Sequence, residues 1–148
     1  MCNNTQYQKS SLEAYNNTTQ ALATNSPITF ANTSVHTGCS IKFNPSSTTI
    51  SLKSPGLYLI AFDEVASNST TASGVVSTQL FKNGVAAPDA FSSSTSDSST
   101  DFVSLAFTKL VRVDPSCCAV DNTTNITFVN TGVDANVSHV NVTVIKLA

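Results

Sequence analysis

The sequence predicts an all-β protein built as an antiparallel sandwich or jelly roll. Short runs in which apolar and polar residues alternate recur along the chain, and turn signals such as Ser54-Pro55-Gly56 and Asn83-Gly84 separate them. No stretch has convincing helical periodicity. The composition, rich in Ser, Thr, Asn and Val with only 11% charged residues, is also typical of β structure. Because the 148 residues contain no Pro/Gly-rich linker, a single folded domain is expected.

The N-terminal segment, residues 1–26, is interpreted as an extended polar arm in front of a domain at 27–148. It contains Asn16-Asn17-Thr18-Thr19, which favours turns over helix interior. The arm is either a disordered tail or a strap that packs on another protein. The start of the chain lacks the charged and apolar regions of a signal peptide, so synthesis and assembly inside a cell are expected.

Nine strands are expected in the domain, separated by turn residues. They fall at 28–30, 35–43, 49–53, 57–62, 75–82, 85–91, 102–113, 124–130 and 137–147. Asn83-Gly84 predicts a tight hairpin, since both residues tolerate the positive φ of a type I′ turn. Residues 67–74 and the Ser/Thr-rich residues 92–100 are predicted to be exposed loops.

The strand at 57–62 is apolar on both faces, which is unusual for a two-sheet protein. Leu57, Leu59 and Ala61 share one face, and Tyr58, Ile60 and Phe62 share the other. One face can fill the core of a sandwich, so the other needs a cover. A neighbouring subunit is the simplest cover, and this strand therefore predicts an oligomer.

Three segments resemble the tumour-necrosis-factor-like jelly-roll superfamily. Residues 54–62 are similar to its Pro-Gly-hydrophobic-Tyr strand, residues 80–84 to its Leu-x-Lys-Asn-Gly hairpin, and residues 142–147 to its closing strand. The superfamily includes the globular heads of complement subcomponent q and the C-terminal domains of bacterial spore-surface collagen-like glycoproteins. The resemblance spans residues 27–148. The Ser116-Cys117-Cys118 corner resembles a short bacterial subgroup of bacterial and prophage-encoded surface proteins, and no Gly-x-y collagen stalk precedes the domain.

The resemblance implies a compact homotrimer, in agreement with the two-sided strand. The expected interface residues are Tyr58, Ile60, Phe62, Phe102 and Leu110.

The four cysteines are Cys2, Cys39, Cys117 and Cys118, and no pair has zinc-ribbon or Cys-x-x-Cys spacing. One interpretation is that they are small buried hydrophobic residues. The other is a disulfide from Cys39 to Cys117 or Cys118, or a bond between chains in a mature particle.

Neither catalysis nor a cofactor is predicted. The two histidines, His36 and His139, could form a zinc site only if the fold brought them to the cysteines, and no metal site is assigned. The carboxylates are scattered singly, and neither a phosphate-binding Gly-rich loop nor a catalytic Ser motif is present. The net charge of −2 argues against nucleic acid, and no apolar run reaches membrane-spanning length.

The predicted function is that of a non-enzymatic trimeric surface protein. The favoured hypothesis is a phage virion decoration or fibre-knob protein, held to a larger capsid, tail or coat assembly by residues 1–26. The alternatives are a structural protein of the bacterial spore surface, or an adhesin head that binds a cell-surface glycan or receptor.

Overall fold

The computed structural model describes residues 9–70, 72–117 and 123–148, and every regular element within these ranges is a strand. The strands are β1 Ser11–Asn16, β2 Gln20–Leu22, β3 Asn32–Thr37, β4 Ile41–Lys42, β5 Ile50–Leu52, β6 Gly56–Asn68, β7 Gly74–Lys82, β8 Val85–Ser96, β9 Val103–Val113, β10 Thr124–Asn130 and β11 Ala135–Lys146. The described part of the chain holds no helix with the length and hydropathy to cross a bilayer.

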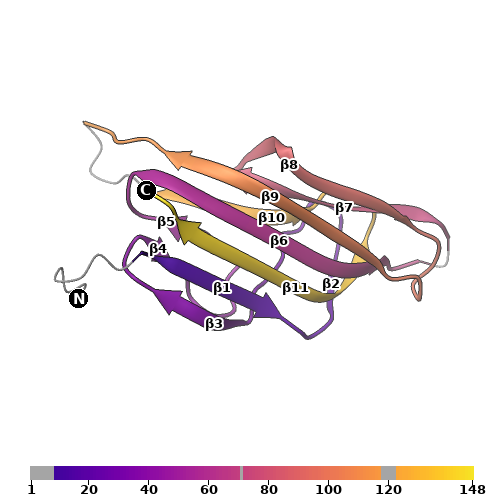
Figure 1. Cartoon of the computed structure of the whole chain (residues 1–148). Coiled ribbons are helices and arrows are strands. Elements are labelled where there is room, and N and C mark those ends of the chain that lie inside the picture. The colour runs from indigo at the N-terminus through magenta and orange to yellow at the C-terminus, as the bar shows by residue number, and fades with distance from the viewer. Residues whose placement is uncertain (1–8, 71, 118–122) are drawn as a thin grey trace.

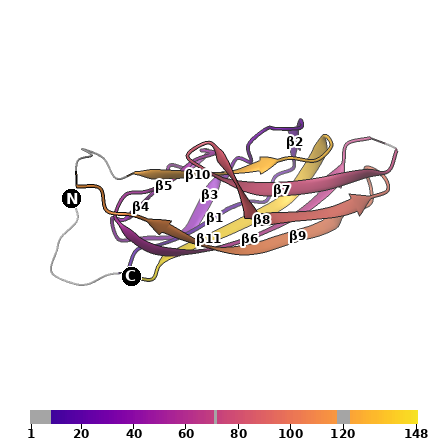
Figure 2. The same cartoon turned by 90° about the horizontal axis from the view of Figure 1, so that it is seen from above.

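Two antiparallel sheets pack face to face, which confirms the predicted sandwich. Sheet A has the order β3-β1-β11-β6-β9, with β2 added on β11, and sheet B has the order β4-β5-β10-β7-β8 (Figure 1). The view from above separates the two layers, with β6, β9 and β11 in one and β5, β7 and β10 in the other (Figure 2). Each sheet buries one face of its strands, so side chains alternate between the shared interior and the two outer surfaces.

The interior has an aromatic part and a polar part. Phe62 of sheet A stacks on Phe107 and Phe128, with ring centroids 4.9 and 4.7 Å away, and Phe30 meets Phe128 edge-on at 5.7 Å. Further along the sandwich the buried side chains become polar, and most of their polar atoms form hydrogen bonds, such as those from Thr78 to Glu64 and from Asn68 to Ser96. This polar group contains Glu64, Ser67, Asn68, Thr78, Ser96 and Asn130.

The predicted hairpin at Asn83-Gly84 is confirmed. Both residues have positive φ, 50° and 78°, and they join β7 to β8 in the sheet B ladder. The Asn83 side chain also accepts a 2.8 Å hydrogen bond from the Asn125 N–H, which ties the turn to β10.

The prediction of an extended arm over residues 1–26 is wrong from Ser11 onward. Residues of β1 pair with both β11 and β3, and β2 pairs with β11, so this segment is part of sheet A. Leu12 and Ala14 point into the core and are fully buried. Residues 1–8 of the predicted arm lie outside the described residues.

The predicted exposed loops are also shorter than expected. Residues 67–68 complete β6 and residues 92–96 complete β8, where they pair with β7. The Asn68 side-chain amide donates a 2.6 Å hydrogen bond to the Ser96 carbonyl, so strand ends that look like loops in the sequence are fastened to each other. The expected strand at 28–30 is reduced to isolated bridges, one of them between Phe30 and Ser47.

Candidate functional site

The outer face of sheet A carries the other apolar side of β6. Leu57, Leu59 and Ala61 point away from the core and stay half-buried, whereas the alternating side chains are buried. A strand with an apolar outer face is expected where another molecule covers the sheet. This face is therefore the candidate functional surface of the protein.

Four large side chains from three neighbouring strands make an apolar patch on this face. Leu59 of β6 lies opposite Leu110 of β9 on one side and opposite Ile145 of β11 on the other. Leu57 is two residues from Leu59 on the same face, and we call these four residues the outer apolar cluster. Leu110 is 51% exposed although it lies opposite the aliphatic side chain of Leu59. Burying such a surface is favourable in proportion to its area.

The adjoining part of the same face is polar. Asp63 of β6 is exposed and lies opposite Asn141 of β11, which in turn lies opposite Tyr15 of β1. The Asn141 amide donates a 3.2 Å hydrogen bond to Glu13 Oε1. The face thus has an apolar end suited to association and a polar end of the kind found at the periphery of interfaces.

Three of the five predicted interface residues are in the interior instead. Tyr58, Ile60 and Phe62 are at most 2% exposed and fill the space between the sheets, so they cannot contact a second subunit. The Tyr58 hydroxyl donates a 2.7 Å hydrogen bond to the Ser54 carbonyl in the turn before β6. Because this partner satisfies the hydroxyl, the tyrosine side of the strand can be the buried one.

The other two predicted interface residues are exposed but far apart along β9. Leu110 belongs to the outer apolar cluster, whereas Phe102 precedes β9 at its opposite end and is 53% exposed. Sequence reasoning placed Leu57 and Leu59 on the core side and did not single out Ile145. The signal for Ile145 was its position next to Val144 on a strand where buried valines alternate with outward-facing residues.

The candidate disulfide is partly tested by the structure. Cys39 is disulfide-bonded, and Cys117 is exposed. Cys2 and Cys118 lie outside the described residues, so the pairing of Cys39 with Cys117 or Cys118 stays a prediction.

The histidines are not brought together by the fold. His36 on edge strand β3 has its Nε2 3.0 Å from the Ile41 carbonyl, and His139 is exposed on β11 opposite Val65. Within residues 9–70, 72–117 and 123–148, no three His, Cys, Asp or Glu side chains group as metal ligands would.

Comparison with known proteins identifies the fold. No protein-family model and no curated protein sequence matches the chain. The globular domain of zebrafish complement 1qA has a TM-score of 0.65 at 11% identity, over 95% of this chain and 98% of that one. Eiger TNF from S. frugiperda has a TM-score of 0.69 at 12% identity, over 95% of this chain and 93% of that one. The fold is a TNF/C1q-like jelly roll.

A third protein of similar fold is the PRD1 vertex protein P5. It has a TM-score of 0.50 at 17% identity, over 94% of this chain and 97% of that one. Sequence identities this low show a shared fold alone, and function depends on the surfaces that each sequence adds to it.

Proposed function

We propose that the protein is a non-enzymatic homotrimer that forms part of the surface of a virion. The observation that carries the proposal is the outer apolar cluster, in which Leu59, Leu110 and Ile145 are in register across three strands of one outer face. A C3 arrangement would bury one copy of the cluster from each subunit around a common axis.

The virion location is supported by likeness at the level of the fold. One similar jelly roll is by its name a vertex protein of PRD1. The low content of charged residues and the Ser/Thr/Asn-rich composition suit a surface that packs repeatedly in a particle. Residues from Ser11 onward belong to sheet A. The proposed attachment to a larger assembly is therefore assigned to the residues before β1 rather than to 1–26.

Trimer formation is tested by adding charge to the cluster without disturbing the core. Leu110→Asp should give a folded monomer in size-exclusion chromatography with light scattering, because a carboxylate in a buried apolar contact costs several kcal/mol without a partner. The matched control is Ser104→Asp, an exposed outward position on the same strand. It should remain a trimer. A wild-type monomer at micromolar concentration, or a trimeric Leu110→Asp variant, would contradict the proposed interface.

The location is tested separately by immunogold electron microscopy with antibodies against the purified domain. Labelling of phage particles from a lysate supports the virion proposal. Labelling of spores instead would overturn it in favour of a spore-surface protein.

A further inference from the structure

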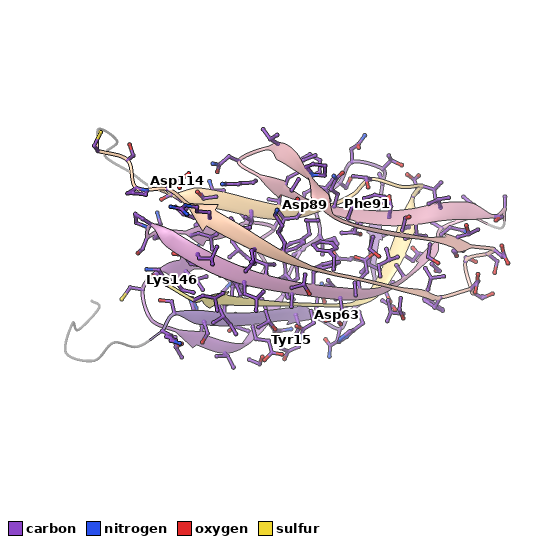
Figure 3. All side chains as sticks on the ribbon, turned by 45° about the horizontal axis from the view of Figure 1, so that its top comes forward. Tyr15, Asp63, Asp89, Phe91, Asp114 and Lys146 are labelled. Carbon is purple, nitrogen blue, oxygen red and sulfur yellow. The ribbon has the colours of Figure 1, made fainter. Side chains whose placement is uncertain are left out.

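All seven Lys and Arg side chains lie in one half of the sandwich, the half that contains the end of β11. Lys146 lies opposite Tyr58 near the start of β6, and Lys9 precedes Ser10, whose carbonyl accepts the Lys146 N–H. The other five lie in the same half, on or directly after β4, β5, β7 and β9. They are Lys42, Lys53, Lys82, Lys109 and Arg112. Figure 3 shows Lys146 and Asp114 at the same end of the sandwich.

The opposite end of the described structure carries carboxylates and no cation. Asp97 and Asp101 lie in the β8–β9 connection and Asp134 in the β10–β11 connection. The overall charge of −2 therefore hides a strong separation of charge along the sandwich. The same half also holds Glu13, Asp89 and Asp114, but its seven cations outnumber these described carboxylates. A region of net positive charge concentrates anionic ligands, so the cationic half favours anions.

A pocket of about 280 Å³ opens in the cationic half between β7 and β9. The pocket is lined mainly by Leu80, Lys82, Lys109, Leu110, Arg112 and Asp114. We call it the cationic pocket. Its volume is close to the lower end of the range for small-molecule sites, which suits one sugar-sized group.

The charges around the cationic pocket are only partly neutralised. The Lys82 ammonium donates a 2.9 Å hydrogen bond to the Arg112 carbonyl, a partner that holds the side chain without cancelling its charge. Arg112 Nε lies 2.8 Å from Asp114 Oδ1, and both side chains are about three-quarters exposed. An exposed pair of this kind is weak, so an anion can compete for the guanidinium. Lys109 is paired with Asp89.

We propose that the cationic pocket binds the carboxylate or sulfate group of an acidic polysaccharide, with the remaining cations of this half guiding the polymer. The cations around the pocket hold the anionic substituent of a sugar unit through charge-assisted hydrogen bonds. Among the described residues, the lining contains no aromatic side chain on which a nucleic-acid base could stack. This inference goes beyond the particle-surface role. Leu110 belongs both to the lining and to the outer apolar cluster, so the pocket lies at the edge of the proposed trimer interface.

The test measures binding of heparin, which is sulfated, and polygalacturonate, which is carboxylated, by isothermal titration calorimetry on the full chain at low salt. Neutral dextran is the control polymer. Both acidic polymers should bind, and higher salt should weaken them because exposed charges are screened. Failure of both to bind better than dextran would overturn the proposal. Equal affinity for double-stranded DNA would overturn the assignment to a saccharide.

Three variants locate the binding within the cationic half. Lys82→Gln should weaken affinity about tenfold, the effect of one lost charge-assisted hydrogen bond. Lys42→Gln changes the net charge equally on an exposed edge strand outside the pocket, and it should have less than about a twofold effect because a single distant charge is screened. Asp114→Asn should strengthen binding, because it removes the carboxylate nearest to the exposed guanidinium.

Equal losses in Lys82→Gln and Lys42→Gln would show that general charge, not the pocket, attracts the polymer, and would overturn the proposal. If circular dichroism shows that Lys82→Gln does not fold, Arg112→Gln replaces it. This side chain is 77% exposed, so its substitution leaves the core intact.

Discussion

Thr78 Oγ1 on β7 donates a 2.9 Å hydrogen bond to Glu64 Oε1 on β6, across the interior of the sandwich. Glu64 is 1% exposed, and its Oε2 has no hydrogen-bond partner within the described structure. Its neighbours in sheet A, Leu105 and Val140, are apolar. Burial raises the pKa of Glu64 to about 7, and the hydrogen bond from Thr78 opposes this shift only in part.

Glu64 should make the protein less stable as the pH rises. Its pKa is about 7 in the folded chain and 4.5 in the unfolded one, so the folded chain holds the extra proton between these values. The stabilisation is fully present below pH 4.5 and is lost as the pH rises through 7, by about 3 kcal/mol in total. Urea unfolding of the wild type and Glu64→Gln across this range measures it.

The Glu64→Gln variant should lose most of the pH dependence, because its amide is neutral throughout. Asp63→Asn, an exposed neighbour on the same strand, is the control and should keep the wild-type dependence. Parallel curves for the wild type and Glu64→Gln would show that another group titrates.

Two glycines should differ strongly in their tolerance of alanine. A Cβ on Gly132 would lie 2.3 Å from the Val75 carbonyl oxygen and 2.7 Å from the Ser77 nitrogen, both of the β7 backbone. Gly132→Ala is expected to destabilise the fold by about 3 kcal/mol or more, because these backbone atoms cannot easily move away. Gly84→Ala meets no atom within 4 Å, and only its φ of +78° is unfavourable, at about 1 kcal/mol. Equal melting temperatures for the two variants would contradict this ranking.

The alternation of apolar residues was enough to predict the sandwich and most of its strands, but not which face of β6 is buried. Both faces of residues 57–62 are apolar, so local pattern gives no preference. The choice depends on distant partners: Phe62 stacks on rings from β9 and β10, and the Tyr58 hydroxyl reaches the Ser54 carbonyl. Neither contact can be read from a single strand.

Strand β1 escaped prediction because its buried side has only one large apolar side chain and ends in an asparagine. Leu12, Ala14 and Asn16 point inward, and an asparagine at the end of such a pattern indicates a turn. Asn16 is accommodated because its amide donates a 3.2 Å hydrogen bond to the Thr29 carbonyl. The outer apolar cluster was missed for a related reason, since it is assembled only by the register of β6, β9 and β11.

Substitutions at Tyr58 should affect folding rather than assembly. Tyr58→Phe removes the hydrogen bond to the Ser54 carbonyl and is expected to destabilise the fold by about 1 kcal/mol. Its oligomeric state should match that of the wild type, because the side chain is fully buried within one subunit. Tyr58→Asp places a carboxylate in the core and should yield insoluble protein. A soluble, folded Tyr58→Asp monomer would instead show that Tyr58 lies in a subunit interface and not in the core.

Removal of N-terminal residues separates the part of the predicted arm that belongs to the fold from the part that precedes it. Deleting 1–26 removes β1, the strand between β3 and β11, together with β2. It exposes the backbone groups of β11 that pair with β1 and the apolar side chains packed on Leu12, so the truncated chain should not fold. Deleting residues 1–8 leaves every described strand intact and should preserve the circular dichroism spectrum and the melting temperature to within a few degrees, about 1 kcal/mol. A folded 1–26 deletion would show that sheet A forms without β1, and an unfolded 1–8 deletion would show that stabilising contacts begin before Lys9.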